Sequence, residues 1–166
     1  MPFTDDGIII AKRPLGENDA VVTIFTAQHG KHNGLVFGAS GRKNVATVQI
    51  GNMVRCTWKA RVAQSLGFWK LETADRYRLD MKNAPVISCA CDLLNHVLAE
   101  RQASPEIYAR AVELFATLSR ENYLAFENFC LSGLGYGPAP TQPAELRRFL
   151  SAHGIRINLP LRDLLA

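Results

Sequence analysis

The sequence predicts an α+β protein: a small five-stranded β-barrel followed by an all-α helical module. In the first 80 residues, runs of β-branched and aromatic residues alternate with Gly-containing turns, whereas later apolar residues recur at helical spacing. Charge divides the chain at the same place. Residues 8–70 hold nine Lys or Arg and two acidic residues, a net charge of +7, whereas residues 81–166 hold eight of each kind. A basic first half of this kind indicates a polyanionic partner, although a basic solvated surface explains it as well.

Five segments of the basic half have the composition of β-strands. We expect strands at residues 7–13, 20–27, 31–39, 51–62 and 66–78. Because no helical pattern interrupts them, residues 1–80 are predicted to form a barrel of the OB type, a fold that binds nucleic acids.

The fourth expected strand has the clearest alternation in the chain. Successive side chains point to opposite faces of a strand. One face is apolar and the other mostly cationic: Val54, Cys56, Trp58, Ala60 and Val62 against Arg55, Lys59 and Arg61. Cations spaced in this way can follow a phosphate backbone, so we expect them to bind DNA. Trp58 is expected in the core, and of Phe68 and Trp69 only one can join it.

Helical periodicity begins after the barrel. We expect helices around residues 90–98, from Pro105, over residues 121–132 with a stop at Gly133, and from Pro143 to Gly154. The predicted domains are therefore residues 1–80, a helical domain over 81–137 and a short C-terminal helical segment over 138–166.

The cysteines and histidines do not predict a metal site. Cys56, Cys89, Cys91 and Cys130 lack zinc-ligand spacing and are expected as reduced thiols, the first and last in the core and the middle two at the start of a helix. His29 and His32 have no further ligand nearby and are better explained as turn residues. We expect no metal and no cofactor.

Catalysis is not predicted either. Glu17 and Asp19 could form a catalytic pair, but a solvated turn or an ion pair is favoured. No apolar run approaches the roughly 18 residues of a membrane span, and we expect a cytoplasmic, nucleoid-associated protein.

A polar loop at residues 38–43 is favoured as a phosphate contact. The complete set of candidate DNA-binding residues is Lys12, Arg13, Lys31, Arg42, Lys43, Arg55, Lys59, Arg61 and Lys70.

Several segments together resemble the RecO family of bacterial recombination mediators. They are residues 7–19, 21–26, 29–31, 38–43, 123–127, 133–137 and 146–150. The resemblance implies an N-terminal OB domain and a helical domain. It also implies binding of single- and double-stranded DNA, strand annealing in DNA repair and recombination, and loading of recombinase onto DNA coated by single-strand-binding protein.

The resemblance further implies two protein partners, RecR and the acidic tail of single-strand-binding protein. In the helical half, Arg101, Arg110 and Arg120 lie beside apolar stripes and are candidates for binding that tail, although they could equally pair with nearby glutamates. Many family members carry zinc-binding cysteines after the third helix. This chain has none there, which implies a shortened member. The alternative is a protein-binding adaptor with little DNA contact.

Overall fold

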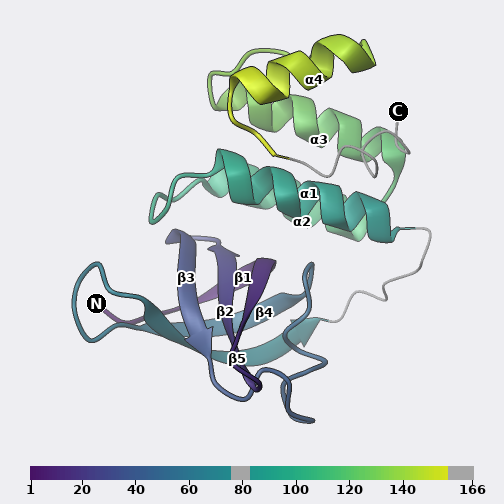
Figure 1. Ribbon diagram of the computed structural model, residues 1–166. Coiled ribbons are helices and arrows are strands. Elements are labelled where there is room, and N and C mark those ends of the chain that lie inside the picture. Colours follow the sequence, from purple (N-terminus) through teal and green to yellow (C-terminus); the bar gives the residue numbers. More distant parts are fainter. Residues whose placement is uncertain (76–82, 157–166) are drawn as a thin grey trace. The chain divides into compact units, whose positions relative to one another are not determined.

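The computed structural model describes residues 1–75 and 83–156. These residues form two units, a barrel unit that includes Ala99–Pro105 and a helical unit (Figure 1).

The barrel unit is a closed five-stranded barrel, which confirms the predicted fold class. Its strands are β1 (Phe3–Leu15), β2 (Asp19–Thr26), β3 (Gly30–Val36), β4 (Met53–Lys59) and β5 (Gly67–Asp75). They are ordered β1-β2-β3-β5-β4 around the barrel (Figure 1). The β3–β5 pairing is parallel and the other four are antiparallel.

Strand β1 is longer than the sequence predicts because it serves two neighbours. Phe3–Ile8 pair with β4, and Gly7–Leu15 pair with β2. A register shift between Ile9 and Ala11 marks an irregularity of the bulge type, which bends a strand and increases its twist. That bend suits a strand that crosses from one side of a barrel to the other.

Strands β3 and β4 are shorter than predicted. Gly38 has a φ of +63°, which ends the extended backbone of the expected third strand soon after Val36. β4 ends at Lys59, and the chain then turns. Val62, expected on the apolar face, is 69% exposed because it lies in this turn.

Two tryptophans are buried inside the barrel, next to the β3–β5 pairing that closes it. Trp58 and Trp69 are 5% and 7% exposed, and their indole N–H groups donate to the carbonyls of Asn33 and Val22 at 3.0 Å. A Cβ on Gly67 would lie 2.2 Å from the Trp58 ring. Glycine is therefore needed here to let a strand backbone pass directly over the indole. Trp69, not Phe68, is the core residue of that pair.

The helical unit contains α1 (Ala84–Val97), α2 (Pro105–Ala116), α3 (Arg120–Gly133) and α4 (Pro143–Ala152). Each of α1, α2 and α3 buries an apolar stripe, and the Ser119 side chain caps α3 by accepting from the Asn122 amide at 3.1 Å. No helix in the described ranges has the length and apolarity of a membrane span.

The start of α1 differs from the prediction. The helix begins at Ala84, with proline in its first turn, so Cys89 and Cys91 lie in its interior and not at its start. Both are buried in the apolar stripe. In α3, the buried Glu127 carboxylate accepts a 2.8 Å hydrogen bond from the Tyr123 hydroxyl one turn earlier.

Candidate nucleic-acid interface

Strand β4 has a cationic face on the outside of the barrel. Val54, Cys56 and Trp58 are at most 5% exposed, whereas Arg55 and Lys59 are exposed. The predicted alternation is therefore confirmed over this strand. Arg61 is also exposed, but it lies beyond the end of β4.

Strand β5 extends this face. Lys70 pairs with Thr57 and Phe68 with Lys59, and directly opposed residues of antiparallel strands share a face. Lys70 is exposed and Phe68 is partly exposed. The cations Lys59, Arg61 and Lys70 therefore lie on adjoining parts of one surface.

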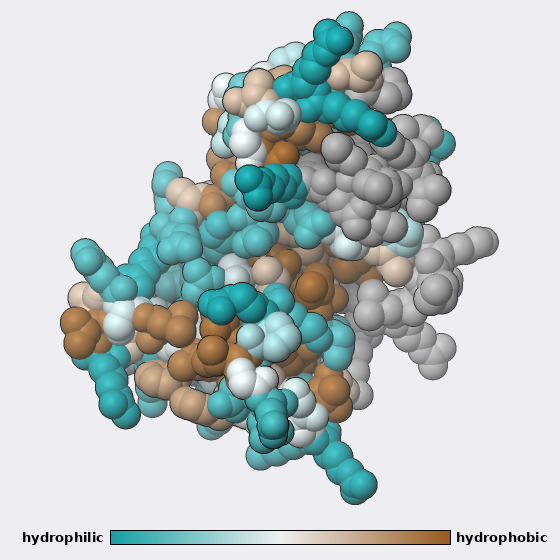
Figure 2. Space-filling model, in the orientation of Figure 1, coloured by the Kyte–Doolittle hydropathy of each residue, from teal (hydrophilic) through white to brown (hydrophobic). Residues whose placement is uncertain are grey.

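An aromatic pair lies beside these cations. Phe37, 61% exposed, stacks on Phe68 with ring centroids 5.5 Å apart. The Arg61 guanidinium lies over the Phe68 ring, 6.0 Å from its centroid. We call Phe37, Lys59, Arg61, Phe68 and Lys70 the outer patch. Figure 2 shows apolar and hydrophilic side chains intermixed on the visible face of the barrel unit.

Arg55 is partly neutralised, whereas no ion pair of the outer-patch cations is present among the residues that the structure describes. Arg55 forms a 3.0 Å ion pair with Asp6 on β1, and Glu72 on β5 lies opposite Arg55 in the strand register. The hydrogen bond to Asp6 raises the pKa of Arg55. Because both side chains of the ion pair are about half exposed, the pair adds little to stability, but it competes with a phosphate for the guanidinium.

The remaining predicted cations differ in their surroundings. Arg13, Arg42 and Lys43 are exposed, and Lys12 donates to the Val48 carbonyl at 3.1 Å. Lys31 is only 8% exposed, and burial lowers its pKa, opposed by the nearby Glu100 carboxylate. The structure thus keeps Lys31 away from the surface on which it was expected.

The loop after β3 is held in a defined shape. The Asp19 carboxylate accepts the Gly38 amide at 2.9 Å, and the Asn44 side chain donates to the Gly38 carbonyl at 3.2 Å. Asp19 therefore supports the loop that carries Arg42 and Lys43, whereas Glu17 is exposed.

His29 and His32 lie close together in the barrel unit, because both rings contact the Phe3 ring. His29 Nδ1 is 2.9 Å from the buried Asp5 carboxylate, and its ring stacks on Phe3 at 3.9 Å between centroids. His32 is in β3 rather than in a turn, and burial lowers its pKa. In the parts of the chain that the structure describes, no three His, Cys, Asp or Glu side chains cluster as metal ligands do.

Arg101 belongs to the barrel unit, which corrects its expected place among the helices. It follows Glu100, which bridges to Lys31, and its own amide donates to the Lys31 carbonyl at 2.8 Å. Its guanidinium lies 5.3 Å from the Trp58 centroid and donates to the Ser65 carbonyl. Backbone pairing with β3 is what draws this segment onto the barrel.

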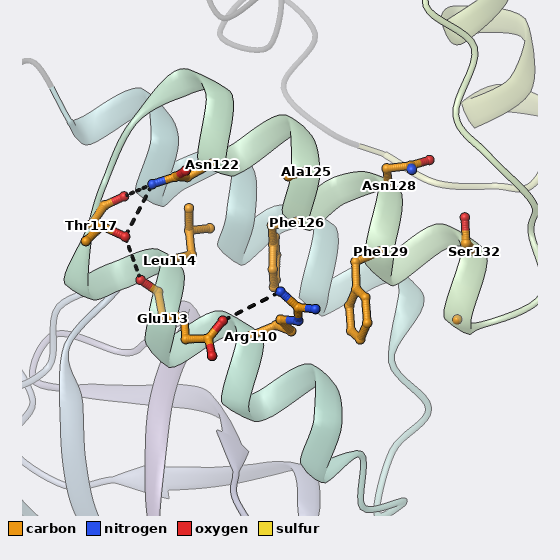
Figure 3. Close-up of a pocket in the computed structure, with 11 residues that line it drawn as sticks. Arg110, Glu113, Leu114, Thr117, Asn122, Ala125, Phe126, Asn128, Phe129 and Ser132 are labelled. Atoms are coloured by element: carbon orange, nitrogen blue, oxygen red, sulfur yellow. Dashed lines mark hydrogen bonds and ion pairs between the residues drawn. The ribbon is translucent and has the colours of Figure 1, made fainter.

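The helical unit has an open groove of about 740 Å³ between α2 and α3 (Figure 3). Arg110 lies in it, 4.7 Å from the Phe129 ring centroid and 3.7 Å from a Glu113 carboxylate oxygen. Phe126 and Leu114 provide an apolar floor. Of the three arginines predicted to bind a partner, Arg110 lines this groove, whereas Arg120 is exposed at the start of α3.

Comparison with known proteins gives a consistent result. Residues 1–76 match the family model described as Recombination protein O N terminal. The chain is 32% identical over 145 residues to DNA repair protein RecO of Jannaschia sp., 31% over 149 residues to that of Rhodospirillum rubrum, and 35% over 147 residues to that of Ruegeria sp..

These alignments cover 81–82% of the chain and therefore extend past the N-terminal domain. The same alignments cover only 59–61% of each relative, so the chain spans about three fifths of their length. The barrel and the matches agree: residues 1–76 match the family model of the N-terminal domain of recombination protein O, and the chain is similar over 81–82% of its length to DNA repair proteins RecO.

Proposed function

We propose that this chain acts in DNA repair as a non-catalytic DNA-binding protein, with the barrel unit as its main DNA-binding element. The observation that carries the proposal is the outer patch, in which three cations adjoin the exposed Phe37 ring and the partly exposed Phe68 ring. Cations contact phosphates and rings stack on bases, so this combination suits single strands in particular. The names of the relatives support the repair role.

The finer role follows the family. Within the proposal, the chain binds single- and double-stranded DNA, promotes annealing of complementary strands, and helps load recombinase on DNA coated by single-strand-binding protein, together with RecR. A cytoplasmic, nucleoid-associated location accompanies this role. The exposed Arg13, Arg42 and Lys43 would add phosphate contacts beyond the outer patch.

Fluorescence anisotropy with labelled single- and double-stranded oligonucleotides, repeated over a salt series, tests the proposal. Each neutralised phosphate contributes about 0.7 to the slope of log K against log salt on single strands and about 0.9 on duplexes. We expect a steep slope. A flat slope or no binding at low salt would contradict DNA binding and favour the adaptor alternative.

The groove of the helical unit favours a second function, binding of an acidic peptide that ends in an apolar side chain. Arg110 offers a guanidinium to a carboxylate, and Phe126 and Phe129 offer apolar surface beside it (Figure 3). The tail of single-strand-binding protein has this chemistry. Titration of a fluorescent tail peptide against the full chain tests the assignment, with a peptide of scrambled sequence and equal charge as its control.

A further inference from the structure

The barrel unit contains a pocket that the proposed phosphate contacts do not use. Its volume is about 520 Å³, and four rings and two guanidinium groups are among its lining: Phe3, His29, His32, Trp58, Arg61 and Arg101. This volume lies within the range of roughly 300–1,000 Å³ that is usual for small-ligand sites. Flat rings beside cations are complementary to a planar base attached to a phosphate.

His29 is both fixed and accessible. The Asp5 carboxylate, 4% exposed, accepts from the Gln28 amide at 2.8 Å and lies 2.9 Å from His29 Nδ1. The His29 ring is nearly parallel to Phe3, with an angle of 4° between their planes, yet its side chain is 38% exposed. A ring held in this way is a stacking platform that loses little conformational entropy when a ligand binds.

Arg61 joins this pocket to the outer patch. Its guanidinium lies over Phe68, and the same residue lines the pocket. Over the described residues 1–75 and 83–156, no carboxylate lies within ion-pair distance of Arg61. A strand bound along the outer patch would therefore have a phosphate contact at the entrance of the pocket.

We propose that the pocket binds one unstacked base of a single strand, with His29 as the stacking surface and Arg61 as the contact of an adjacent phosphate. This inference rests on the proposed DNA binding and adds a single-base site to it. A duplex keeps its bases stacked and paired, and extracting one costs a few kcal/mol. The pocket therefore gives the barrel a preference for single strands.

The test uses the full chain and two oligonucleotides of equal length: oligo-dT, and a backbone of the same phosphates with every base removed. Ala103 is exposed and lines the pocket, so Ala103→Trp fills the pocket without deleting a packed side chain. Ala46→Trp, at an exposed position of the loop after β3, is the matched control. We expect wild type and control to prefer oligo-dT over the base-free backbone, with about tenfold coming from the pocket.

Ala103→Trp should lose that tenfold component while its affinity for the base-free backbone stays unchanged. His29→Gln, which keeps a donor for Asp5 but removes the ring, should lose it too, with thermal melting used to verify that the fold persists. An unchanged preference in both variants would overturn the pocket assignment while leaving DNA binding intact. If wild type binds neither oligonucleotide, the proposed function and this inference both fail.

Discussion

The barrel unit and the helical unit differ in how they use their charges. The barrel half carries the net positive charge, yet part of it is already engaged: Lys31 is buried, Lys12 donates to a loop carbonyl, and Arg55 pairs with Asp6. The helical half is neutral overall, but Arg110 lies in an open groove against Phe129. Net charge therefore identifies the region that attracts a polyanion, whereas local geometry decides which cations can contact it.

The largest expected effect separates the two units directly. Replacing Lys59, Arg61 and Lys70 with Ala should reduce the salt slope for single-stranded DNA by about two and weaken binding by more than tenfold at low salt. The control replaces three exposed arginines of the helical unit with Ala, namely Arg120, Arg148 and Arg156, which changes the net charge equally. Equal losses in the two variants, measured by anisotropy, would show that only total charge matters.

A second comparison concerns two glycines, one in each unit. Gly67→Ala places a methyl group against the Trp58 ring and should lower the free energy of unfolding by about 1–3 kcal/mol. Gly133→Ala, at the end of α3, meets no atom within 4 Å and should be close to neutral. Urea titration measures both. Similar values would mean that the barrel closure relaxes around the added methyl group.

Each unit contains a buried thiol that should lower the stability of the fold at alkaline pH. Burial raises the pKa of Cys56 in the barrel and Cys130 in α3 to about 12, from the ordinary value of 9.0. Above pH 9 the unfolded chain loses these protons while the folded chain keeps them, so stability falls as pH rises from 9 toward 12. The variants Cys56→Ala and Cys130→Ala should each show a shallower fall, by up to about 1.4 kcal/mol per pH unit. Parallel curves for wild type and variants in pH-dependent urea titrations would contradict the burial of these thiols.

The smallest expected effect concerns the groove. Arg110→Ala should weaken binding of the tail peptide by about fivefold, because the ion pair of a partly exposed guanidinium with a peptide carboxylate contributes about 1 kcal/mol at most. Arg120→Ala, at the start of α3 and outside the groove lining, is the matched control and should change the affinity by less than twofold. Isothermal titration calorimetry distinguishes the two. Equal weakening would move the peptide site away from the groove.

Local patterns predicted the barrel well. The alternation along β4 placed Trp58 inside and Lys59 outside, because a strand with one buried face repeats every two residues. The helices of the second half followed from apolar spacing, with boundaries altered where proline allowed an earlier start, as at Ala84.

Contacts between distant segments could not be predicted in this way. The stacking of Phe37 on Phe68 requires the parallel pairing of β3 with β5, and no periodicity indicates which strands close a barrel. The placement of Arg101 similarly depends on the bridge from Glu100 to Lys31. Asp5 and His29 are 24 residues apart in the sequence, so no local pattern indicates their contact.

The closure between β3 and β5 has a consequence for motion. Two residue pairs join these strands, Gly34 with Gly67 and Leu35 with Phe68, whereas eight pairs join β1 to β2. Regions with few backbone hydrogen bonds open locally at lower free energy than the rest of a fold. Amide hydrogens at this seam should exchange with deuterated solvent before those of β1 and β2. Phe68 belongs to both the β3–β5 pairing and the outer patch. A strand of DNA bound on the outer patch would therefore slow amide exchange at this pairing, so the exchange rate would detect DNA binding.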